Sequence, residues 1–322
     1  MKFATPRHLL AATIILGALA GVAGCSTPHA QPTTIAENTS AFTEAQKPRI
    51  IEHFDLTGGQ LPENIVGAAD GGVDVTFAAA RQVAHISPSG KTTVLGALPT
   101  PENTAAKTPV LGFPLTTGLV RRGDTFYVLY ATGEDATTGL WKLIPGHDPE
   151  RIAALPGTGL PNGLAFDSRS DTFYAADSVT GNIVSIPLEG GEPTVWSADK
   201  ALRTTGFLGV NGVKVHNGNV YASNLDLGTV VRIPIKSNRA AGAVTTVAKN
   251  LPGIDDFAFS GRGNQIIAAI DPTSTVVAIS STGKQHTLLT KGTACPTQPR
   301  SWSVARSYGS RVQRTRPSPT PT

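Results

Sequence analysis

The chain has 322 residues, of which 34 are Gly and 24 are Pro, and only 16% are charged. No long apolar helical periodicity follows the first two dozen positions, so the composition indicates an all-β chain with many turns. The formal net charge is +4, but the part from Cys25 to Pro299 carries 20 basic and 23 acidic residues. This part contains no basic stripe, and we expect no nucleic-acid partner.

The N-terminus has the pattern of an export signal. Lys2 and Arg7 precede an apolar run from Leu9 to Ala23, which is too short for a comfortable transmembrane helix. The run ends in Val22-Ala23-Gly24-Cys25, which resembles a bacterial lipobox. We therefore predict a signal peptide over residues 1–24 and a lipid on the Cys25 thiol. The protein would then lie outside the cytoplasm, anchored to the bacterial membrane of the cell envelope by the lipid alone. An ordinary signal peptide, in which Cys25 follows small residues by chance, is the alternative.

Residues 25–48 are rich in Ser, Thr, Pro, Ala and Gln and lack β or helical periodicity. This composition predicts a flexible tether in front of a domain that spans residues 49–292. The only other cysteine is Cys295, so a lipidated Cys25 leaves no possible intrachain disulfide. The domain must therefore be stabilised by its core.

Five copies of one unit follow the tether. Each copy begins its first β run with a residue at an equivalent position and continues with further short β runs between turn residues; these positions are Glu63, Thr117, Asn162, Asn211 and Asp255. They are separated by 54, 45, 49 and 44 residues. A period of this size, with several short strands in each unit, predicts a β-propeller. A tyrosine recurs in three successive copies as Tyr127, Tyr174 and Tyr221, and packing between blades explains it best.

The equivalent positions predict a metal site. The innermost strands of a propeller line its central channel, so equivalent residues converge on the axis. Four of the five, Glu63, Asn162, Asn211 and Asp255, carry a carboxylate or an amide carbonyl. Such an all-oxygen set suits a hard divalent cation, Ca²⁺ before Mg²⁺, with water completing the shell. The alternative is that these side chains only cap the starts of the strands.

Asn-Gly pairs by themselves most often indicate turns. Asn217-Gly218 lies between two β runs and predicts a hairpin turn. Asn162-Gly163 and Asn211-Gly212 each follow a loop and precede the first strand of a unit, where no tight hairpin is expected. Residues 155–159 resemble a sortase sorting motif, but they lie in mid-chain without an apolar segment and basic tail behind them. We interpret them as a loop that connects two blades.

Four short motifs carry a family resemblance; they are Leu61 to Asn64, Leu160 to Leu164, Val210 to Val213 and Pro252 to Phe257. Over roughly Ile50 to Thr290, the chain resembles the senescence-marker-protein/gluconolactonase/regucalcin-like family of six-bladed propellers. The resemblance implies a divalent ion, usually Ca²⁺, bound by Glu63, Asn162, Asn211 and Asp255. It also implies hydrolysis of lactones or related esters and phosphoesters, with the ion polarising the carbonyl group of a lactone.

The same resemblance suggests catalytic residues. Asp255 could act beside the metal, and Asp256 is a second candidate base. Adjacent residues of a strand point to opposite faces, so we favour the alternative that Asp256 bonds inside its blade. The stretch from Leu115 to Gly118 offers no clear counterpart to the Arg and Asn residues that contact substrate in characterised lactonases. No serine-hydrolase, zincin or nucleotide-loop motif occurs, and the seven His residues lack ligand spacing.

The C-terminal residues do not continue the pattern. Residues 293–322 are rich in Arg, Pro, Ser and Thr, where a six-bladed propeller would require one more blade. We expect five clear blades and a degenerate or truncated last one, followed by a disordered tail. An alternative hypothesis is a shifted reading frame near Ala294, beyond which permitted codons could encode the opening of a blade.

The sequence therefore predicts a monomeric, lipid-anchored lactonase-like propeller that hydrolyses a small lactone or ester. A non-catalytic propeller of the cell envelope that binds a ligand or a protein is the alternative. A purely structural envelope protein, which would need no metal, is a third possibility.

Overall fold

Alternating short strands and turns produce five antiparallel sheets of four strands in the computed structural model, within the residues that it describes. These residues are 50–103 and 105–294, and all belong to one compact unit, Phe42–Thr322. Each sheet takes four consecutive strands and forms one blade. Blade 1 contains β1 (Pro62–Gly67), β2 (Val73–Phe77), β3 (Gln82–Ile86) and β4 (Thr92–Ala97); blade 2 contains β5 (Leu115–Arg122), β6 (Thr125–Ala131), β7 (Gly139–Leu143) and β8 (Glu150–Ala154); blade 3 contains β9 (Pro161–Asp167), β10 (Thr172–Asp177), β11 (Asn182–Pro187) and β12 (Thr194–Ser197); blade 4 contains β13 (Val210–His216), β14 (Asn219–Asn224), β15 (Thr229–Pro234) and β16 (Thr245–Ala248); blade 5 contains β17 (Ile254–Phe259), β18 (Ile266–Ile270), β19 (Thr275–Ile279) and β20 (Gln285–Leu289).

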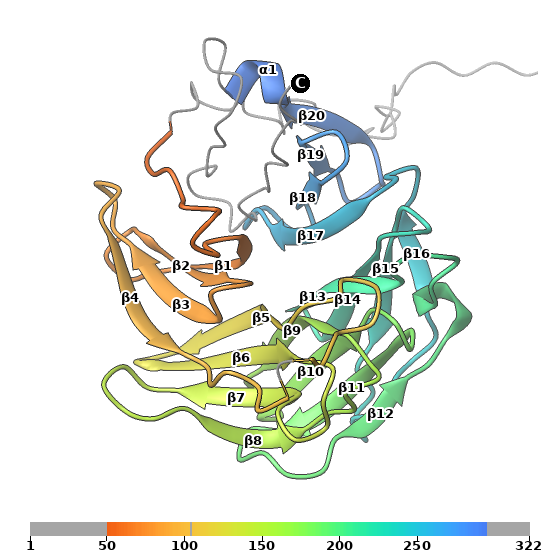
Figure 1. Cartoon of the computed structure of the whole chain (residues 1–322). Coiled ribbons are helices and arrows are strands. Elements are labelled where there is room, and N and C mark those ends of the chain that lie inside the picture. Colours follow the sequence, from red (N-terminus) through yellow and green to blue (C-terminus); the bar gives the residue numbers. More distant parts are fainter. Residues whose placement is uncertain (1–49, 104, 295–322) are drawn as a thin grey trace, which may run out of the picture. The chain divides into compact units, whose positions relative to one another are not determined.

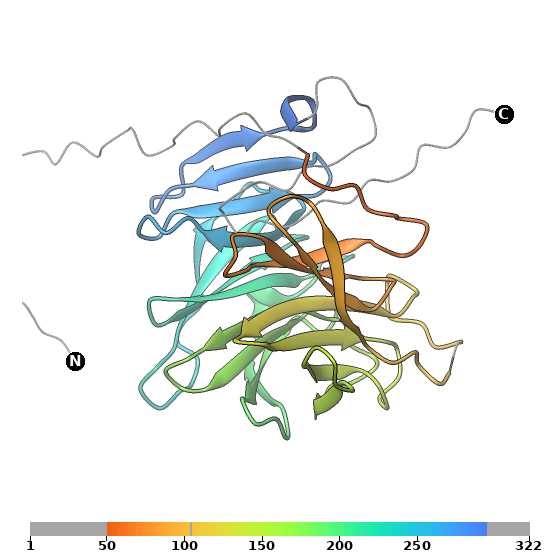
Figure 2. The ribbon, with the colours of Figure 1, turned by 90° about the vertical axis from the view of Figure 1, so that its left-hand side faces the viewer.

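The blades follow one another around a common axis. The first strand of each blade, β1, β5, β9, β13 or β17, lies nearest the middle, and the fourth strand lies outside (Figure 1). Figure 2 shows the same sheets from the side, in the colour order of the sequence. A short 3-10 helix, η1 (Lys200–Leu202), precedes β13, and a four-residue helix, α1 (Lys291–Ala294), follows β20.

This architecture confirms the predicted all-β propeller with five clear blades. No sixth four-stranded sheet occurs within residues 50–103 and 105–294. The predicted signal peptide, the tether, Cys25 and residues 295–322 of the tail lie outside the described residues. In the described part of the chain, no helix is both long and apolar enough to span a bilayer.

The core consists of apolar layers between consecutive blades. Both faces of each of the three middle blades are covered by neighbouring blades, which is why their strands are mostly apolar on both sides. The recurrent tyrosines belong to these layers, as predicted. The Tyr127 ring lies 4.7 Å from that of Phe173 in the next blade, and the Tyr221 ring lies 4.9 Å from that of Phe259. Buried Tyr174 packs in one cluster with blade 4 residues.

The two blades at the ends of the series differ from the rest. The segment before blade 1 folds back on it, so that Phe54 packs edge-to-face against Phe77 with ring centroids 5.1 Å apart. On blade 5, a cluster around Ile267, Ala278 and Leu289 contains, among the described residues, side chains of that blade only. The pattern agrees with the prediction that the blade series is incomplete at its C-terminal end.

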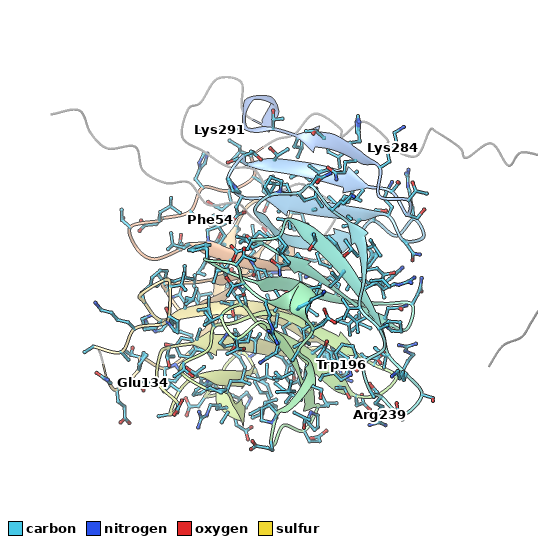
Figure 3. The ribbon with its side chains drawn as sticks, turned by 90° about the vertical axis from the view of Figure 1, so that its right-hand side faces the viewer. Phe54, Glu134, Trp196, Arg239, Lys284 and Lys291 are labelled. Atoms are coloured by element: carbon cyan, nitrogen blue, oxygen red, sulfur yellow. The ribbon has the colours of Figure 1, made fainter. Side chains whose placement is uncertain are left out.

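Two turn predictions are confirmed. Asn217 and Gly218 join β13 to β14 with φ values of 47° and 76°, the conformation that a two-residue hairpin turn requires. Residues 155–159 lie between β8 and β9 and thus connect blade 2 to blade 3. A further link joins blades 3 and 4 at the periphery, where Trp196 of β12 donates its indole N–H to the carbonyl oxygen of Arg239 at 2.8 Å (Figure 3).

Candidate functional site

The four predicted ligands lie at equivalent places in four blades. Glu63 and Asn162 are the second residues of β1 and β9, and Asn211 and Asp255 are the second residues of β13 and β17. All four side chains belong to residues that are only 2% to 5% exposed. Buried polar groups of this kind need partners or a bound ion.

Thr117, the fifth equivalent residue, bonds to the neighbouring blade. Its hydroxyl group donates a hydrogen bond to the carbonyl oxygen of Pro161 at 2.9 Å and thereby joins blade 2 to blade 3. Similar hydroxyl bonds continue around the axis. Ser178 donates to the carbonyl oxygen of Val210 at 2.7 Å, and Ser223 donates to that of Asp255 at 2.6 Å. These buried bonds hold the innermost strands at fixed positions relative to one another.

The glycine after each candidate Asn allows a close approach of the next blade. A Cβ atom on Gly163 would overlap the carbonyl oxygen of Asn211, and one on Gly212 would overlap the carboxylate of Asp256. These two Asn-Gly pairs therefore do not form hairpin turns, which confirms the prediction made from their positions. They place an amide side chain next to a point of backbone contact between blades.

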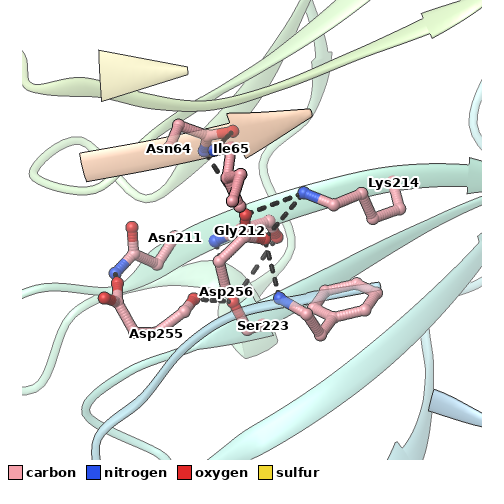
Figure 4. Close-up of polar contacts among 9 residues, drawn as sticks. Asn64, Ile65, Asn211, Gly212, Lys214, Ser223, Asp255 and Asp256 are labelled. Atoms are coloured by element: carbon pink, nitrogen blue, oxygen red, sulfur yellow. Dashed lines mark hydrogen bonds and ion pairs between the residues drawn. The ribbon is translucent and has the colours of Figure 1, made fainter. Parts of the chain in front are cut away.

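The structure brings Asn211 and Asp255 into direct contact. The Asn211 Nδ2 atom donates a hydrogen bond to Asp255 Oδ1 at 2.6 Å, from β13 to β17 (Figure 4). Because the amide uses its nitrogen for this bond, its carbonyl oxygen is the atom that Asn211 could offer to a cation. Glu63 and Asn162 stand at the equivalent strand starts of blades 1 and 3. Two carboxylates and two amide carbonyls fit the oxygen preference of Ca²⁺.

Within the described residues, no three His, Cys, Asp or Glu side chains gather as a possible metal site. The predicted set contains only two residues of these types. A cation at this place would depend on the Asn162 and Asn211 carbonyls as well as on the two carboxylates.

Asp256, the second predicted catalytic residue, is the centre of a polar network beside these ligands. Lys214 of β13 donates to its two carboxylate oxygens at 2.8 and 2.9 Å, and the Phe257 amide donates at 2.8 Å. Asn64 of β1 donates through Nδ2 at 3.3 Å (Figure 4). Asp256 thus bonds within its own strand and also to blades 1 and 4. Its two oxygens together accept four hydrogen bonds in this network.

A second polar cluster, which no sequence pattern predicts, lies toward the other ends of the inner strands. His85 bonds to Asp74 through Nδ1 at 2.9 Å and to Asp70 through Nε2 at 3.0 Å, and Arg121 of blade 2 pairs with the fully buried Asp74 at 2.8 Å. These residues line a cleft of about 630 Å³. Asp74 and His85 are paired opposite one another in the β2–β3 register. Their contact can be predicted from the sequence only if this register is known.

No protein-family model matches the chain, and no curated protein matches its sequence. It is similar to the crystal structure of a calcium-binding protein, regucalcin, from Agrobacterium tumefaciens. The TM-score is 0.53 and the identity 15%, over 74% of this chain and 78% of the other.

Two further solved structures have the same fold. A catalytically inactive variant of virginiamycin B lyase from Staphylococcus aureus, solved with quinupristin, has a TM-score of 0.52 and 14% identity over 75% of this chain and 72% of the other. A Bacteroides thetaiotaomicron protein of unknown function has a TM-score of 0.52 and 15% identity over 71% of this chain and 57% of the other.

At identities this low, the comparisons show the fold alone. They establish a β-propeller of the kind found in regucalcin and virginiamycin B lyase. A fold of this type supports many activities, so function has to be argued from the site.

Proposed function

We propose that this propeller is a metal-dependent hydrolase of a lactone or ester, with Ca²⁺ or another divalent cation bound by Glu63, Asn162, Asn211 and Asp255. The observation that carries the proposal is the buried contact between Asn211 and Asp255 at 2.6 Å, at two of four equivalent strand starts. The resemblance of these motifs to lactonase-like propellers supports it, as does the calcium-binding regucalcin among the structures of the same fold.

The chemistry follows from the residues. A bound divalent cation would polarise the carbonyl group of the substrate. Asp255 would accept a proton from a water molecule as the water oxygen attacks the carbonyl carbon. The ring or ester C–O bond then breaks, and the proton passes to the departing oxygen, which gives a hydroxy acid or an alcohol and an acid. Asp256 would hold the start of β17 in position through Lys214 and Asn64.

The first test is calcium binding by calorimetry on the wild-type protein and on the Glu63→Gln and Asp255→Asn variants. We expect binding in the wild type and a loss of at least about tenfold in affinity in each variant, because each removes one of two charged ligands. The matched control is Asp167→Asn, which neutralises a carboxylate at the opposite end of β9 from Asn162. No binding to a folded wild-type sample would refute the metal site.

The second test is hydrolysis of a panel of lactones and esters in the presence of Ca²⁺. Turnover that disappears in the Asp255→Asn variant is the expected result. Calcium binding without turnover on any member of the panel would favour the alternative, a non-catalytic ligand-binding propeller.

We also propose that the protein is anchored to the outer side of the bacterial membrane through a lipid on Cys25. The Val22 to Cys25 motif supports this location. The wild type should fractionate with membranes, and the Cys25→Ala variant should not be lipidated when its N-terminal peptide is examined by mass spectrometry. A wild-type N-terminal peptide without a lipid would refute the anchor.

A further inference from the structure

An apolar cluster lies at the same end of the inner strands as the candidate ligands. It joins buried Leu115, Leu160 and Leu208 to half-buried side chains around them. The half-buried members come from loops next to the strands of four blades; they are Leu61, Leu111, Phe113, Val179 and Leu225. We call the half-buried members the apolar collar.

The sequence ties this cluster to the ligand positions. Leu61 and Leu160 stand two residues before Glu63 and Asn162. Residues two apart in an extended chain project to the same side, so an apolar side chain precedes each of these oxygen ligands on its own face. Leu160 is fully buried, so a molecule that approaches the oxygen set from this end meets half-buried Leu61 of this pair, together with the other half-buried members of the collar.

Exposed apolar side chains extend the collar on blade 4. Phe207 is 49% exposed and Leu227 is 41% exposed; Leu227 follows Asp226 in the sequence, and the Phe207 amide bonds to the Asp226 carboxylate. The Asp226 carboxylate accepts hydrogen bonds from the Thr204 hydroxyl at 2.6 Å and from the Phe207 amide at 3.0 Å, which fixes the loop that carries Phe207.

We propose that the substrate carries an alkyl or aryl group next to its lactone or ester, and that the apolar collar binds this group. The inference rests on the proposed function for the identity of the reacting group, but the preference for an apolar neighbour follows from the collar itself. A polyhydroxylated lactone would have to bury its hydroxyl groups against Leu61, Phe113 and Leu225, which offer them no side-chain hydrogen bonds.

The test compares γ-lactones of increasing alkyl length, namely γ-valerolactone, γ-heptalactone, γ-nonalactone and γ-dodecalactone, with glucono-δ-lactone. In the presence of Ca²⁺, we expect kcat/KM to rise by about two- to fourfold per added methylene until the collar is filled. We expect glucono-δ-lactone to be the poorest substrate. Equal rates along the series, or a preference for glucono-δ-lactone, would overturn the inference.

Binding of the corresponding alkyl γ-lactams, measured by calorimetry, separates this inference from the proposed function. Lactams resist hydrolysis, so their affinity should increase with chain length whether or not the protein is a hydrolase. Lactam binding that depends on chain length, without hydrolysis of any lactone, would support the collar and refute the hydrolase. Hydrolysis of lactones without any dependence on chain length would support the hydrolase and refute the collar.

Variants of the exposed collar extension make the test specific. Phe207→Ser and Leu227→Ser should reduce the gain per methylene for the longer lactones to less than about twofold, while calcium affinity stays the same, because neither residue belongs to the ligand set. The matched control is Val195→Ser on outer strand β12, whose side chain is 58% exposed. An equal effect in the control, or no effect in either collar variant, would overturn the assignment.

Discussion

The ion pair between Lys214 and Asp256 provides the sharpest test of how the site is held together. Lys214 Nζ lies 2.8 and 2.9 Å from the two carboxylate oxygens, and the side chains of Lys214 and Asp256 are 25% and 7% exposed. Replacing Lys214 with Met keeps most of the length of the side chain but leaves the nearly buried Asp256 charge without its ion-pair partner. Removal of one partner from a buried pair costs about 3 to 5 kcal/mol. Because the Lys214 side chain is a quarter exposed, we expect Lys214→Met to lower the free energy of unfolding by about 2 to 4 kcal/mol.

The assay is urea denaturation, with the free energy and the m value fitted separately. The matched control is Lys142→Met, because the Lys142–Glu150 pair is 3.8 Å apart and exposed on both sides. We expect that variant to lose less than about 1 kcal/mol.

The double variant Lys214→Met/Asp256→Asn removes both charges while an amide oxygen can still accept from the Phe257 N–H. It should be more stable than Lys214→Met alone, with a coupling energy of about 1 kcal/mol or more. If Lys214→Met is no worse than the Lys142 control, or if the two single effects simply add, the ion pair does not hold blades 4 and 5 together as argued.

Three further predictions concern single groups near the site. Gly163→Ala should destabilise the protein by about 1 to 3 kcal/mol in urea, because the added methyl group meets the Asn211 carbonyl oxygen; Gly67→Ala, with nothing within 4 Å of the added atom, should not. Partial burial tends to raise the pKa of Asp226, but bonds from the Thr204 hydroxyl and from the amides of Phe207 and its neighbours outweigh it and lower the pKa to about 2. The stabilisation from Asp226 should be fully present above about pH 4 and lost as the pH falls through about 2, so the thermal stabilities of the wild type and Asp226→Asn should converge over that range. Ser223→Ala should cost about 1 to 3 kcal/mol and weaken calcium binding, because the Ser223 hydroxyl accepts from the Gly212 amide at 2.8 Å and donates to the Asp255 carbonyl; unchanged stability and affinity would show that this bond does not position Asp255.

The sequence predicts the fold because every blade of a propeller repeats the same arrangement of four consecutive strands and short turns. The positions of Asn162 and Asn211, the spacing of the repeats and the Asn217-Gly218 turn are all visible in short segments. Local signals of this kind predict strands, turns and blade order. They also select the equivalent strand starts at which the candidate ligands lie.

The contacts around the site are less predictable because they join distant segments. Lys214 occupies an ordinary strand position, and its partner Asp256 is on the next blade. The cluster of His85, Asp74 and Arg121 likewise requires the β2–β3 register and a side chain from blade 2. No spacing of His and acidic residues along the chain reveals such a group.

The first and fifth repeats depart from the repeat pattern at one position, and the residues at that position bond to one another. Where the middle repeats have glycines such as Gly163 and Gly212, these two have Asn64 and Asp256. In the middle blades, the glycine lets the next inner strand approach. At the two ends of the blade series, the polar replacements instead reach one another, with Asn64 Nδ2 donating to Asp256 Oδ2 at 3.3 Å. A side-chain hydrogen bond thus connects blade 1 to blade 5, and it lies directly beside Glu63 and Asp255. The residues that link the ends of the blade series are therefore the sequence neighbours of the two carboxylates of the proposed metal site.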